Sequence, residues 1–133
     1  MKRLLLFFAV VTMLASCSTD TTSVVNLTVG KHDWVSYSDS AINDPLYYSS
    51  TFAMPEINNI VFEQGLVQAY IVFSNGVQQA LPCVQHNKNA KGATWTRTID
   101  FQYAAGNLTF FVTNSDFIDD QPEAMDFRVV IIK

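Results

Sequence analysis

The chain has 133 residues, of which 49% are hydrophobic and 15% are charged, and this is the length and composition of one globular domain with a short leader. Its formal net charge is −4, from 12 acidic and 8 basic residues. We therefore expect no nucleic acid as a partner, because proteins that bind phosphate backbones need clustered Lys and Arg.

The first segment of the chain has the three parts of a secretory signal. Lys2 and Arg3 form a positive start, Leu4 to Leu14 carry no charge, and the small residues Ala15 and Ser16 follow. The apolar run is too short to cross a bilayer as a helix, which needs about 20 apolar residues. We therefore treat residues 1–16 as a processing segment that takes no part in the fold, and their removal lowers the net charge to −6.

The end of the leader carries a second signal. The order Leu14, Ala15, Ser16, Cys17 resembles the bacterial lipobox, in which the cysteine thiol is acylated and the peptide bond before it is cut. The resemblance implies a lipid attachment site at Cys17, and two or three acyl chains anchor a protein stably. The alternative is a plain signal peptide with an incidental cysteine. Ser18 directly follows the cysteine, and the absence of Asp at this position implies sorting to the outer membrane. The domain could then lie on either face of that membrane.

Residues 17–23 then form a short polar tether, and residues 24–133 form the domain. Apolar and polar residues alternate in the domain with the period of two that is typical of strands. Seven segments show the pattern: 24–29, 46–54, 66–73, 77–81, 94–103, 108–113 and 127–132. The pair Asn75-Gly76 predicts a hairpin between the third and fourth segments. This series predicts an all-β fold, an antiparallel immunoglobulin-like sandwich of about seven strands.

One segment departs from this alternation. Between Pro55 and Gly65, the residues Ile57, Ile60 and Val61 have helical spacing. Proline suits the first turn of a helix, and glycine suits the left-handed position after its last residue. We expect one short helix here, closing an open end of the sandwich.

A wider resemblance covers nearly all of the domain. It is carried by Trp34, Tyr47-Tyr48, "PEI" at 55–57, Gly65, "VQAY", "ALP" at 80–82, "YAAGNLTF" and the terminal "FRVVII". With these residues the chain resembles small lipoproteins and carboxy-terminal domains of Bacteroidetes envelope proteins. The resemblance implies a location in the cell envelope and a β domain, and it implies no activity.

The residues that could carry catalysis are few. His32 and His86 are the only histidines, and Cys83 lies three residues before His86. The pair could form a nucleophile and base or supply two zinc ligands, whereas a structural site needs four and a catalytic site three. The alternative is a buried, inert thiol beside a surface histidine. We favour the buried, inert thiol beside a surface histidine, and we expect no enzyme activity and no cofactor apart from the acyl lipid.

A carboxylate-rich loop precedes the last predicted strand. It contains Asp116, Asp119, Asp120, Glu123 and Asp126. Ca²⁺ binds six to eight oxygen ligands in flexible geometry, so such a loop is a weak candidate for calcium. The alternative is a solvated acidic loop, and the spacing lacks the turn glycine of a recognised calcium loop.

The aromatic residues suggest a second kind of site. Six of them cannot all point inward: Trp34, Tyr37, Tyr47, Tyr48, Trp95 and Phe111. Exposed rings can stack on sugars, which makes Trp34, Tyr47, Tyr48 and Trp95 candidates for glycan binding. The alternative is packing in the core, where large rings dominate the energetics.

The sequence thus predicts a lipid-anchored envelope protein with a non-enzymatic binding role. Its partner would be an envelope protein, or alternatively a glycan held by exposed aromatic rings; a hydrolase is a third and weaker hypothesis.

Overall fold

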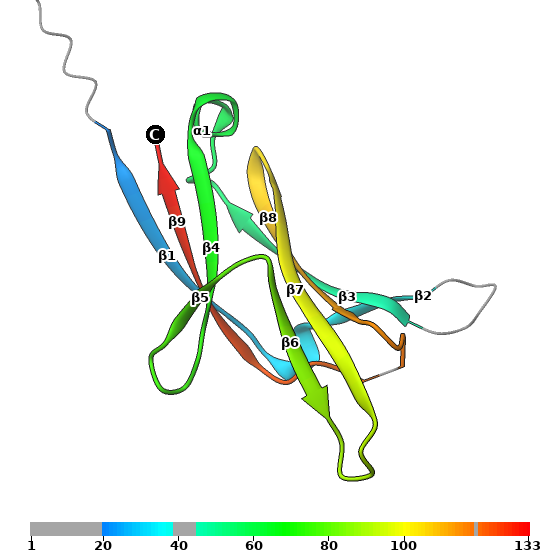
Figure 1. Cartoon of the computed structure of the whole chain (residues 1–133). Helices are drawn as coiled ribbons and strands as arrows, with labels where there is room; N and C mark the ends of the chain where they lie inside the picture. Colours follow the sequence, from blue (N-terminus) through cyan, green and yellow to red (C-terminus); the bar gives the residue numbers. More distant parts are fainter. Residues whose placement is uncertain (1–19, 39–44, 119) are drawn as a thin grey trace, which may run out of the picture.

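The computed structural model describes residues 20–38, 45–118 and 120–133. These residues form nine strands, one α-helix and one turn of 3₁₀ helix (Figure 1). The strands are β1 (Thr22–Val29), β2 (Val35–Ser38), β3 (Pro45–Met54), β4 (Leu66–Val72), β5 (Gln78–Ala80), β6 (Cys83–Lys88), β7 (Thr94–Ala104), β8 (Gly106–Asn114) and β9 (Met125–Ile132). The helices are η1 (Lys31–Asp33) and α1 (Asn59–Gln64).

The strands form two antiparallel sheets, as predicted. The four-stranded sheet has the order β1-β9-β4-β5, and the five-stranded sheet has the order β2-β3-β8-β7-β6 (Figure 1). The predicted all-β sandwich with one short α-helix is therefore confirmed. In an immunoglobulin domain the order within the sheets is ABED and CFG, whereas here the first strand pairs with the last strand.

The core lies between the two sheets and draws on both of them. Phe110 of β8 stacks on Phe127 of β9, with ring centroids 3.9 Å apart. Leu108 and Val112 flank Phe110 on the same strand face, and all three are fully buried. The strand β9 lies between β1 and β4. Phe127, Val129 and Ile131 on its inner face are buried, whereas Val130 is half-buried and Ile132 is exposed on its outer face.

The hairpin predicted at Asn75-Gly76 is present, and Gly92 and Gly106 also lie in hairpin turns with positive φ. Gly76, in the connection from β4 to β5, has φ +81°, and its N–H donates to the Phe73 carbonyl at 2.8 Å. Gly106 has φ +87° and is the second of the two turn residues between the paired Ala104 and Asn107. Glycine adopts positive φ without the steric cost that a Cβ atom causes, so each turn is determined locally.

The helix is shorter than the predicted segment and begins later. Asn58 caps its first turn, because the Asn58 Oδ1 accepts a hydrogen bond from the Val61 N–H at 3.0 Å. Pro55 lies in the preceding turn and not in the helix. The left-handed conformation predicted for Gly65 was wrong, since this residue is extended with φ −95°. Glycine is required at position 65 for a different reason, because a Cβ there would lie 2.5 Å from the Ile132 carbonyl oxygen.

Two strands have no counterpart among the predicted segments. The strand β2 has four residues, all exposed, and β6 begins directly after Pro82, between the predicted segments 77–81 and 94–103. The inward face of β6 carries Cys83, Gln85 and Asn87, so its alternation is too polar to be recognised as a half-buried strand. The predicted 77–81 segment contains only the short strand β5.

Candidate functional site

The outer face of the five-stranded sheet carries a cluster of three aromatic rings, which we call the outer aromatic cluster: Tyr37, Tyr47 and Phe111. Tyr37 of β2 is paired with Tyr47 of β3, and their rings stack with centroids 4.9 Å apart and planes 9° apart. Phe111 of β8 meets Tyr47 edge to face, at 5.5 Å and 72°. The neighbouring residues Phe110 and Val112 point into the core, so strand alternation places Phe111 outside.

A shallow groove of about 310 Å³ runs beside this cluster. It is lined by Tyr47 of β3, Phe111 and Thr113 of β8, and Asp100 and Gln102 of β7. Asp100 of β7 lies directly opposite Phe111 in the antiparallel register. The groove therefore joins two aromatic rings to a carboxylate, an amide and a hydroxyl.

Asp100 is the distinctive polar residue of the groove. Burial against the sheet raises the pKa of its carboxyl above the ordinary value of 3.8. Among the described residues, no hydrogen-bond donor and no cation pairs with this carboxylate. Because polar groups removed from water normally find partners within the protein, a half-buried carboxylate without one is free to accept hydrogen bonds from a ligand.

The position of His86 bears on the chemistry of this face. His86 of β6 lies opposite Thr96 of β7, which is four residues along the strand from Asp100. Four residues of a strand span about 13 Å, so the imidazole and the carboxylate are too far apart to share a proton. The groove offers hydrogen bonds and ring faces to a ligand.

The four residues predicted for glycan binding do not form one surface. Trp34 is 4% exposed, its indole N–H donates to the Glu123 carbonyl at 3.2 Å, and its ring packs on Phe127. Tyr48 is 3% exposed and lies on the core side of β3. As a correction, these two rings belong to the core: alternation along β3 turns Tyr48 inward and Tyr47 outward, and Trp34, between η1 and β2, packs against Phe127.

Trp95, the fourth predicted residue, lies elsewhere in the fold. It is half-buried on the inner face of β7, opposite Asn87 of β6. Its indole Nε1 is buried and has no hydrogen-bond partner among the described residues, and the same is true of the Asn87 Nδ2. Trp95 also lines a cavity of about 370 Å³ under the loop that holds Asp116 and Asp120. Only Tyr47, of the four, belongs to the outer face.

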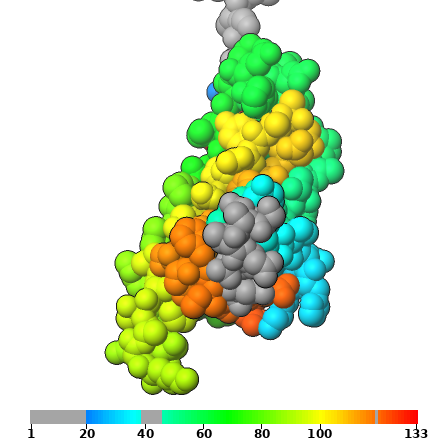
Figure 2. Space-filling view, turned by 90° about the vertical axis from the view of Figure 1, so that its right-hand side faces the viewer, coloured from blue at the N-terminus to red at the C-terminus, as the bar shows by residue number. Residues whose placement is uncertain are grey.

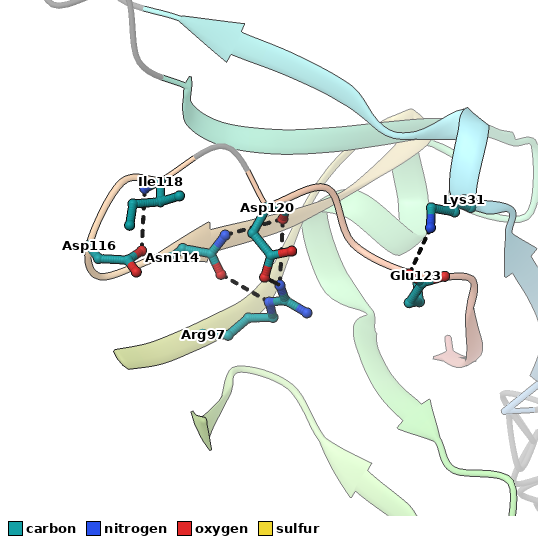
Figure 3. Close-up of polar contacts among 7 residues, drawn as sticks. All are labelled: Lys31, Arg97, Asn114, Asp116, Ile118, Asp120 and Glu123. Carbon is teal, nitrogen blue, oxygen red and sulfur yellow. Dashed lines mark hydrogen bonds and ion pairs between the residues drawn. The ribbon is translucent and has the colours of Figure 1, made fainter. Parts of the chain in front are cut away.

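The carboxylates predicted for calcium have separate partners (Figure 3). Asp120 pairs with the Arg97 guanidinium at 2.8 Å, and Glu123 pairs with the Lys31 ammonium at 2.8 Å. The Asp116 Oδ1 accepts from the Ile118 N–H at 3.3 Å, and the Asp126 Oδ1 accepts from the Thr28 hydroxyl at 2.6 Å. Asp119 lies outside the described residues.

These contacts hold the four described carboxylates apart from one another. Within residues 20–38, 45–118 and 120–133, no three acidic, histidine or cysteine side chains gather as ligands for a metal ion.

Cys83 and His86 do not meet. Both lie on β6, and residues three apart on a strand point to opposite faces. Cys83 is buried and free, and burial raises the pKa of its thiol, whereas His86 is exposed. A thiol with a raised pKa is less reactive at neutral pH, which fits the description of Cys83 as a small core residue.

Cys17 and the rest of the predicted lipobox lie outside the described residues. In the part of the chain that is described, no helix is long and apolar enough to cross a membrane. Comparisons of the chain with known protein families, with curated proteins and with solved structures find no match.

The sequence contained part of the signal for the groove. Alternation along residues 94–103 places Asp100 and Gln102 opposite Ile99, which is a core residue in the structure. Tyr37 and Phe111 were among the six aromatic residues that could not all point inward. The missing information was the register between strands, because it decides that Asp100 lies opposite Phe111 and that Tyr37 lies opposite Tyr47.

Proposed function

We propose that the mature protein is a lipid-anchored, non-enzymatic binding module of the bacterial cell envelope, and that it binds a glycan through the groove beside the outer aromatic cluster. The observation that carries this proposal is the outer aromatic cluster standing next to the unpartnered carboxylate of Asp100.

The groove has the two kinds of group that sugar binding uses. The C–H faces of a sugar ring pack on an aromatic ring, whose π face is electron-rich. Sugar hydroxyls donate to a carboxylate such as Asp100 and exchange hydrogen bonds with the amide of Gln102 and the hydroxyl of Thr113. Tyr37 is 54% exposed, so it offers a free ring face at the edge of the site.

The proposed location is supported by the leader. Cys17 with Leu14, Ala15 and Ser16 resembles a lipobox, and an acylated Cys17 would hold the domain close to the bilayer through residues 17–23. Confinement to a membrane surface raises the effective concentration of the domain for ligands on the same surface.

The glycan proposal is tested with the full-length lipoprotein in detergent. We expect it to retain at least one polysaccharide on an array of bacterial envelope and plant glycans. Tyr37→Ala should weaken that binding about tenfold or more, because it removes the exposed ring face and the ring that stacks on Tyr47, and an aromatic ring that anchors a ligand contributes over 1 kcal/mol.

Phe117→Ala is the matched control, because Phe117 is also an exposed ring, at 46%, and lies outside the groove. Equal binding by Tyr37→Ala and the unchanged protein would disprove a role for the outer aromatic cluster. If no glycan is retained, a protein partner becomes the better hypothesis, and cross-linking on intact cells would identify it.

The lipid anchor is tested separately. Metabolic labelling with a palmitate analogue should mark the protein, and Cys17→Ala should abolish the label and move the protein to the soluble fraction. Protease treatment of intact cells then shows which face of the membrane the domain occupies: cleavage before lysis places it outside.

A further inference from the structure

One end of the sandwich exposes a group of large apolar side chains, which we call the apolar end: Ile60, Phe62, Leu66 and Ile132. Leu66 begins β4 and is 56% exposed, and it lies opposite Ile132, which ends β9 and is 37% exposed. Ile60 and Phe62 lie on α1, directly before β4, and are 45% and 49% exposed. Monomeric proteins rarely gather large apolar side chains on the surface without a partner for them.

The apolar end is also the end at which the chain enters the domain. Thr22, the first residue of β1, is paired with Ile132. In Figure 1, α1, the start of β1 and the C-terminus lie together at one end of the sandwich, and Figure 2 shows α1 at the tip of the molecule. All residues that precede Thr22 therefore join the domain beside the apolar end.

We propose that the apolar end lies against the lipid bilayer and that its four side chains enter the interfacial region, so that the domain has a fixed orientation on the membrane. This inference rests on the proposed lipidation of Cys17. Four residues lie between Cys17 and Thr22, and even fully extended the five Cα–Cα steps from Cys17 to Thr22 span at most about 18 Å. The anchor therefore keeps the apolar end close to the membrane surface.

The charges at this end indicate which interaction would hold the apolar end at the bilayer. Glu63 lies on α1 among the apolar side chains, Asp20 lies just before β1, and Lys133 directly follows Ile132. Two carboxylates beside one ammonium group give no net attraction to anionic lipid headgroups. Burial of apolar area is thus the contribution that we expect, and a weak interfacial contact of this kind becomes effective when an acyl chain supplies the second attachment.

The orientation on the membrane also determines whether the groove stays accessible. Val77 marks the opposite end of β4, in the hairpin to β5. When the domain rests on its apolar end, the outer faces of both sheets point along the membrane plane and not into the bilayer. The outer aromatic cluster would then remain open to ligands along the bilayer.

The test uses the full-length lipoprotein reconstituted in vesicles of phosphatidylethanolamine and phosphatidylcholine. A polarity-sensitive fluorophore is attached to Leu66→Cys, or to the control Val77→Cys, with Cys83→Ala in both proteins. Leu66 and Val77 have nearly the same exposure, 56% and 55%, so both positions accept the label on the folded surface. Ile60→Cys is a second reporter at the apolar end.

We expect blue-shifted emission at Leu66 and Ile60, and about twofold or greater quenching by brominated lipid, with neither effect at Val77. Aqueous emission at all three positions, in protein that floats with the vesicles, would overturn the orientation while leaving the lipid anchor intact. Folded protein that does not float at all would overturn the proposed lipidation, and the orientation with it.

Discussion

At the scale of single residues, the close approach of neighbouring backbone atoms explains why residue 65 is a glycine. Gly65 is extended, so it is not there to supply a left-handed backbone. A Cβ at this position would meet the Val61 carbonyl oxygen at 2.8 Å as well as that of Ile132. Glycine at this position allows the end of α1 to pack against the end of β9.

We expect Gly65→Ala to lower the free energy of unfolding by about 1–3 kcal/mol, the usual cost of overpacking. The added methyl group meets backbone atoms, which move only if α1 and β9 separate. Gly30→Ala is the matched control, because a Cβ there meets only the flexible carboxylate of Asp33, at 2.7 Å. Urea denaturation measures both variants, and equal stabilities would show that α1 is free to shift.

Asp100 makes a pH-dependent contribution to stability. Burial raises the pKa of its carboxyl above 3.8 in the folded protein, so the folded state favours the protonated form. This contribution is present below the unfolded pKa and is lost as the pH rises through the folded pKa. At neutral pH the ionised Asp100 therefore destabilises the fold.

We expect Asp100→Asn to raise the melting temperature at pH 7, with a difference from the unchanged protein that disappears below pH 3.8. Calorimetry across this pH range measures it. The same variant should bind glycan more weakly, because the amide replaces a charged acceptor. A variant that is less stable at pH 7 would indicate that the carboxylate has a stabilising partner.

At the scale of elements, the connection from β8 to β9 is held by side chains of its neighbours. The Arg97 guanidinium of β7 donates to Asp120 and, through Nε, to the Asn114 Oδ1 at 2.9 Å. The Asn114 Nδ2 in turn donates to the Asp120 carbonyl at 3.3 Å. Arg97 is 13% exposed at its side chain, whereas Lys31, which holds Glu123, is 47% exposed.

This difference in exposure predicts different costs for removing the two cations. Arg97→Met should destabilise the protein by about 1.5–3 kcal/mol, the range for hydrogen bonds to charged groups. Lys31→Met should cost less than about 1 kcal/mol, as for exposed ion pairs. Thermal denaturation compares them, and hydrogen exchange should show faster opening of the 115–122 loop in Arg97→Met alone. Equal effects would contradict this account of the loop.

At the scale of the whole molecule, β9 unites the four-stranded sheet. It pairs with β1 on one side and with β4 on the other, and its Phe127 stacks on Phe110 of the opposite sheet. The first and last strands are neighbours although the whole domain separates them in sequence. Formation of this sheet therefore depends on contacts of high sequence separation, which are typical of slowly folding β proteins.

Removal of residues 125–133 should leave the protein unfolded, because β1 would lose the strand with which it pairs among the described residues and Phe110 would lose its stacking partner. Circular dichroism and tryptophan fluorescence report the loss. Removal of Lys133 alone is the control, since its N–H makes a single hydrogen bond to the Thr21 carbonyl, at 3.1 Å. A cooperative thermal transition in the longer truncation would contradict the central role of β9.

The sequence by itself determined the features that arise locally. Period-two alternation indicated which residues of most strands face the core, and Asn75-Gly76 marked a hairpin, because turn geometry depends on a few adjacent residues. Only the tertiary structure decided that β1 lies beside β9, that β6 is a strand, and that Tyr37, Tyr47 and Phe111 meet beside Asp100. Those relations depend on the register between strands that are distant in the chain, and each strand's own alternation carries no information about its neighbour.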